Sequence, residues 1–220
     1  MTERVCKTIE ISGKGVTRFV QISGGIVRQD VTSVKADSNQ LNTLDGIHLF
    51  PSLIELSVAD NRLVRMDALS CLRHLVLLNL KHNSISEIKG LDYLQCVQCV
   101  CLAGNTIKEM KGMERCSQLR YLDLADNCIS HISDLSMLSC LETLLLHGNA
   151  ISSLESVSVH FPSSIRALTL SENAVEDITQ FSSLASLKHL TQLSVMANPC
   201  FNVIDTSLVI LMSLTLGGSS

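Results

Sequence analysis

Apolar and polar positions along this chain follow a motif of 22 residues that repeats almost without interruption. In each copy, apolar residues stand eight, five and three positions before an asparagine, and again two positions after it. The clearest copy places Leu75, Leu78 and Leu80 before Asn83 and Ile85 after it. The spacing by two from Leu78 to Leu80 predicts a short strand with one buried face, and the asparagine marks the turn that follows it.

The asparagine of this motif recurs, and we expect its side chain to point into the molecule. Six copies are spaced by 22 residues, and two more follow at spacings of 24 and 25. The set is Asn39, Asn61, Asn83, Asn105, Asn127, Asn149, Asn173 and Asn198. Because an amide side chain both donates and accepts, a column of them can bond buried backbone groups of successive turns. We therefore predict a structural asparagine ladder.

The whole pattern is that of leucine-rich repeats. It predicts an α/β repeat solenoid of about eight coils, 22–25 residues each, with a concave parallel β-sheet. Stacked coils bury together an apolar set that no single coil can bury alone. We divide the chain into a degenerate N-terminal cap repeat (1–30), the solenoid (31–200) and an atypical, truncated tail (201–220).

Composition narrows the possible functions. The net charge of −4 and the lack of basic runs argue against a nucleic-acid surface. Residues 1–7 lack the apolar core of a signal peptide, and the apolar run at 208–216 is too short to cross a bilayer. Nine cysteines without disulfide-bracketed caps predict free thiols in a reducing cytoplasm.

The cysteines offer one spacing that could suggest a metal site, at Cys96, Cys99 and Cys101. The repeat places Cys99 and Cys101 on the outer face of one strand and Cys96 before it, so four ligands do not converge. Four of the other thiols are interpreted more simply, as small buried hydrophobes. These are Cys71, Cys116, Cys140 and Cys200.

The histidines give no catalytic motif. His147 is placed one coil from Asp123, and a polar contact is the simpler interpretation of such a pair. No glycine-rich phosphate loop accompanies it. We therefore expect no enzyme activity, no catalytic residue, no cofactor and no metal.

The concave face carries the candidate partner site. Residues two, four and six positions before each ladder asparagine are expected to point out of the sheet. Apolar side chains gather in the middle of this face, with charged flanks, and an exposed apolar patch indicates a protein partner. Chance accumulation of exposed apolar residues in a long array is the alternative. The candidate residues are Leu77, Asn79, Cys99, Cys101, Tyr121, Asp123, Leu145, His147 and Met196.

Particular coils resemble the family of the centrosomal protein of 97 kDa. The similar segments are residues 56–66, 134–136, 143–149, 184–187 and 192–200, and the likeness extends over about residues 5–200. This resemblance implies a scaffold at the distal end of centrioles that restrains cilium assembly with a coiled-coil capping partner. It also implies a centrosomal or ciliary-base location. The chain has no calmodulin-binding segment, so calmodulin is not an expected partner.

A second family leaves an alternative open. The leucine-rich-repeat subunit of protein phosphatase-1 has the same 22-residue period, and similarity to it implies an enzyme regulator that binds through the concave face. That resemblance implies more acidic and aromatic residues on this face than the present chain offers, with its two tyrosines and no tryptophan.

Overall fold

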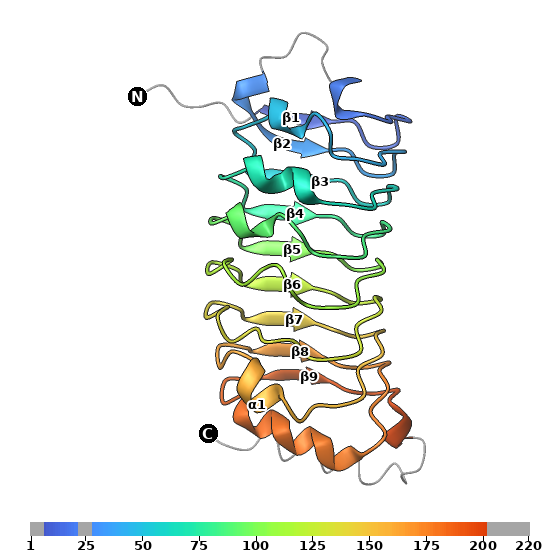
Figure 1. The fold of residues 1–220 in the computed structure, drawn as a ribbon, viewed down its shortest axis with the longest axis vertical. Coiled ribbons are helices and arrows are strands. Elements are labelled where there is room, and N and C mark those ends of the chain that lie inside the picture. Colours follow the sequence, from blue (N-terminus) through green and yellow to red (C-terminus); the bar gives the residue numbers. More distant parts are fainter. Residues whose placement is uncertain (1–6, 22–27, 202–220) are drawn as a thin grey trace.

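A computed structural model describes residues 7–21 and 28–201, which form one stack of coils with all strands side by side (Figure 1). The strands make a single parallel sheet in chain order, β1 to β9. They are β1 (Lys7–Glu10), β2 (Val31–Lys35), β3 (Glu55–Ser57), β4 (Leu77–Asn79), β5 (Cys99–Cys101), β6 (Tyr121–Asp123), β7 (Thr143–Leu145), β8 (Ala167–Thr169) and β9 (Gln192–Ser194). The predicted solenoid with a parallel sheet is confirmed.

The sheet has nine strands within these residues, one more than the eight ladder asparagines suggest. The extra strand is β1, which belongs to the degenerate cap repeat and pairs with β2 despite a register shift after Lys7. Lys14 stands where the asparagine would be, but its backbone N–H donates to Oδ1 of Asn39, 3.1 Å away. Residues 1–6 and 22–27 of the predicted cap, and 202–220 of the predicted tail, lie outside the described residues. The domain boundaries therefore stay predictions.

Equivalent positions of successive coils pack on one another in the core. The register pairs Leu56 with Leu78, then Val100, Leu122 and Leu144. Each of these side chains is 0% exposed. Complete burial of one such side chain contributes about 1.5–3 kcal/mol, which is why a stack of coils is stable when one coil is not.

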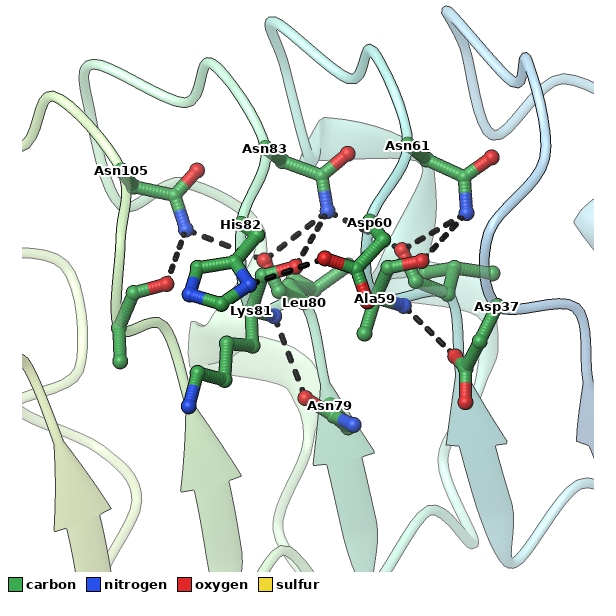
Figure 2. Close-up of polar contacts among 12 residues, drawn as sticks. Asp37, Ala59, Asp60, Asn61, Asn79, Leu80, Lys81, His82, Asn83 and Asn105 are labelled. Atoms are coloured by element: carbon green, nitrogen blue, oxygen red, sulfur yellow. Dashed lines mark hydrogen bonds and ion pairs between the residues drawn. The ribbon is translucent and has the colours of Figure 1, made fainter.

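The asparagines form a ladder along the turns that follow the strands (Figure 2). At Asn83, Nδ2 donates to the carbonyls of Leu80 (3.0 Å) and Lys81 (3.2 Å), and to that of Val58 one coil earlier (3.0 Å). Oδ1 accepts the N–H of Leu63 at 2.9 Å. Each asparagine thus ties its own turn to the preceding coil.

Short helices lie on the side of the coils away from the strands (Figure 1). The two longer coils place their additional residues there, in α1 (Val157–His160) and η6 (Ile178–Ser186), and these two helices contact each other. The other single turns are η1 (Phe19–Gln21), η2 (Arg28–Asp30), η3 (Ile47–Leu49), η4 (Asp67–Cys71), η5 (Leu91–Tyr93) and η7 (Pro199–Phe201).

The cysteines do not all follow the expected burial. Cys116 and Cys200 are buried, as the interpretation as small hydrophobes requires. Cys71 is exposed and Cys140 is half-buried, so that interpretation is wrong for both. Cys71 ends the η4 turn, where the chain runs along the outside of the coil, and the repeat spacing alone does not show this.

Candidate protein-binding surface

The outward face of the sheet brings part of the predicted apolar patch together. Leu77, Cys99 and Tyr121 are register partners on β4, β5 and β6, so their side chains form a continuous row. All three are half-buried, with one side in contact with the sheet and the other open. In the next row, Cys101 and Leu145 are likewise half-buried. This surface, Leu77–Cys99–Tyr121 with Cys101 and Leu145, is called the central patch below.

Asp123 divides the central patch and is less accessible than the sequence suggests. It lies in register between Cys101 and Leu145 and is only 8% exposed. Its Oδ1 accepts the N–H of Ala125 at 3.1 Å, and its Oδ2 accepts the thiol of Cys101 at 3.3 Å. The carboxylate therefore orders neighbouring groups of the surface and presents little area to a partner.

The thiols and the phenol of the central patch are held in their neutral forms. Burial, followed by the nearby Asp123 carboxylate, raises the pKa of Cys101 to about 11 and that of Tyr121 to about 12. The same two causes raise the pKa of Cys99. Because a nucleophilic cysteine requires a lowered pKa, this surface is suited to contact and not to covalent chemistry.

Alkylation at neutral pH should separate the cysteines by accessibility and pKa. We expect iodoacetamide to modify the exposed Cys96 and Cys128 at least about tenfold faster than Cys101 and Cys116. The pKa of Cys116 is raised to about 12 by burial and then by nearby carboxylates. Peptide mass mapping over a time course measures the rates; early modification of Cys101 would contradict the structure of the patch.

Asn79, another predicted site residue, belongs to a polar network at the N-terminal half of the sheet. Its Nδ2 donates to Oγ of Ser57 (3.0 Å), and that hydroxyl donates to Oδ1 of Asp37 (2.7 Å). Asp37 also accepts the N–H of Ala59, and Asn79 Oδ1 accepts the N–H of Lys81, as Figure 2 shows. These side chains are satisfied within the chain, which makes this half of the face polar and self-contained.

A rim of polar residues borders the sheet and was missed in the sequence. Each residue directly before a ladder asparagine has a positive φ, among them Asp60 (52°), His82 (52°), Asp126 (52°) and Glu172 (55°). Nδ1 of His82 lies 2.9 Å from Oδ1 of Asp60 one coil away (Figure 2). These residues could have been found from their position in the repeat, because the turn directs the residue before each asparagine out of the coil, beside the concave face.

His147 and Met196 lie apart from the central patch, in a hollow of about 420 Å³ at the C-terminal end of the face. Met196 comes after β9, two strands beyond Leu145, so it does not belong to the apolar middle as expected. His147 also has a different polar contact from the expected one with Asp123: its Nδ1 lies 3.0 Å from Oγ1 of Thr169. Glu172 lines the same hollow.

A hollow of about 760 Å³ lies beyond the ladder turns, where Lys111 pairs with Glu109 at 2.7 Å. No group of three or more histidine, cysteine or acidic side chains within residues 7–21 and 28–201 is arranged to hold a metal ion. In the same part of the chain, no helix has the length and apolar character needed to cross a membrane.

Comparison with known proteins agrees with the fold. The profile of the leucine-rich-repeat family matches residues 113–215. An internalin of Listeria monocytogenes superimposes with a TM-score of 0.72 at 20% identity, covering 88% of this chain and 61% of its own. An internalin C2 of the same organism superimposes with a TM-score of 0.73 at 23% identity, and the match covers 86% of this chain and 80% of the internalin chain. The chain is a leucine-rich-repeat solenoid.

The most informative sequence similarity is to a centrosomal protein. This chain is 47% identical to human "Centrosomal protein of 97 kDa" over 48 residues, which are 22% of its length. The mouse protein is 46% identical over the same length. The matched segment is 6% of the length of each relative, so the similarity reaches a small part of those proteins.

Proposed function

We propose that this protein is a non-enzymatic interaction scaffold of the centrosome that holds a protein partner on its concave face. The observation that carries the proposal is the central patch, where Leu77, Cys99 and Tyr121 make a half-open apolar row on the outward face of the sheet. Exposed apolar surface of this kind is typical of protein contact sites. Neutral thiols and a neutral phenol add contact area without charge.

The centrosomal part of the proposal is supported by the similarity to the 97-kDa centrosomal protein. In its finer form, the scaffold acts at the distal end of centrioles or at the ciliary base and restrains cilium assembly. Its partner there is a coiled-coil capping protein, which could lay an apolar helix face along the patch. Regulation of a protein phosphatase is the competing assignment.

Affinity purification distinguishes the two assignments. The tagged chain, expressed in ciliated cells, is expected to recover centriolar proteins and to co-localise with a centriole marker. Recovery of a phosphatase catalytic subunit in their place, with a diffuse signal, would reject the centrosomal assignment. The matched control is the same chain carrying Lys108→Ala, a change at an exposed residue beyond the ladder turn.

A further inference from the structure

The concave face is electrostatically asymmetric along the solenoid. In its N-terminal half, lysines stand among the carboxylates: Lys35 lies 3.6 Å from Glu55, and Lys81 occupies an outward position two residues before Asn83. The C-terminal half is different. Across the described strands and rim from Tyr121 to Ala197, the outward rows contain no lysine or arginine.

Three carboxylates occupy this C-terminal half. Asp123 lies on the floor, and the exposed Asp126 and Glu172 lie on the rim. Within the described residues, none of the three forms an ion pair with a lysine or arginine. Arg120 and Arg166, at the opposite ends of the strands, are directed to Glu142, at 2.8 and 4.0 Å. The rim carboxylates are therefore available to an incoming cation.

The hollow beside this rim has the features of a site for a long cationic side chain. Glu172 lines it together with the hydroxyls of Thr169, Ser171 and Ser194. The Oγ atoms of Ser171 and Ser194 lie 2.6 Å apart, and both hydroxyls can still accept a further hydrogen bond. Met196, 52% exposed, offers a thioether against which the methylene stem of a lysine or arginine can pack.

We infer that the C-terminal half of the concave face binds a basic amphipathic segment of a protein partner. Its apolar residues cover Tyr121 and Leu145, and its lysines or arginines face Asp126 and Glu172. One of these cations enters the hollow beside Met196. This inference rests on the proposed function, because it specifies the chemistry of the partner at the same face.

The test uses two fluorescent synthetic peptides with identical leucine positions, one with a lysine polar face and one with a glutamate polar face. Fluorescence anisotropy measures their affinity for the full chain at physiological salt. We expect the lysine peptide to bind about tenfold more tightly than the glutamate peptide. Equal affinities would overturn the inference.

A variant with Asp126→Asn and Glu172→Lys shows whether the rim is responsible. Asparagine tolerates the positive φ of position 126, and position 172 already holds a long side chain in that conformation. This variant should bind the lysine peptide about tenfold more weakly than the unchanged chain does.

The matched control is Glu155→Gln with Glu176→Lys, which makes the same change in charge at exposed residues beyond the turns. It should alter binding less than about twofold. Equal loss in both variants would show general attraction to an acidic protein and reject the site. If native partners are lost with Leu145→Glu but kept by the rim variant, the concave site stands and the basic segment is rejected.

Discussion

Asn105→Ala is expected to lower the free energy of unfolding by about 3 kcal/mol. Asn105 is 7% exposed, and its Nδ2 donates to the carbonyls of Leu80 (3.1 Å), Leu102 (2.9 Å) and Ala103 (3.3 Å). Its Oδ1 accepts the N–H of Ile85 at 2.9 Å. Alanine leaves these backbone groups without their side-chain partner in a buried turn, where an unsatisfied group costs about 1–3 kcal/mol.

Urea denaturation followed by circular dichroism measures this effect. Lys108→Ala lies in the same coil at an exposed position, and we expect it to change stability by less than about 0.5 kcal/mol. A loss below about 1 kcal/mol for Asn105→Ala would mean that the ladder contributes little and that apolar packing alone orders the coils.

Gly112→Ala is expected to destabilise the protein by more than about 3 kcal/mol. Gly112 has a φ of 89°, and a Cβ there would lie 2.1 Å from the carbonyl oxygen of Ile88 in the preceding coil. Residues that carry a side chain rarely adopt this φ. The contacted atom belongs to the backbone, so it cannot rotate away as the end of a side chain can. Relief of the contact requires two coils to separate.

Gly13→Ala is the matched control for this change. Gly13 also has a positive φ (67°), but a Cβ there has nothing within 4 Å. Its substitution should cost only the conformational strain, about 1–2 kcal/mol. Thermal melts of the two variants separate strain from coil contact; equal losses would show that the approach of Ile88 to Gly112 is unimportant.

The architecture was predictable because one repeated motif determines both which side chains are buried and which form hydrogen bonds. Leu78 and Leu122 occupy the same position of the motif, and both are completely buried in register with their neighbours. The ninth strand was harder to predict, since β1 forms without an asparagine in its own repeat. In the turn after β1, the N–H groups of Lys14 and Val16 donate to Oδ1 of Asn39 in the next coil, so this turn joins the ladder without an asparagine of its own.

The surface was predictable in direction but not in its interactions. The repeat places Leu77 and Tyr121 on the outward face, and both lie there. It does not reveal that Asp123 bonds to the thiol of Cys101, or that His147 is paired with Thr169. Those pairings depend on rotamers and on distances between coils, which a linear pattern does not contain.

We propose that the central patch captures the partner. Proximity labelling in ciliated cells tests it, with the 220-residue chain compared with its Leu145→Glu, Tyr121→Ala variant. Both side chains are half-buried on the outward face, so we expect the thermal melt to change little. We expect centriolar proteins to be labelled by the unchanged chain and not by the variant. Equal labelling by both chains would contradict the proposal and move the binding site to another surface of the solenoid.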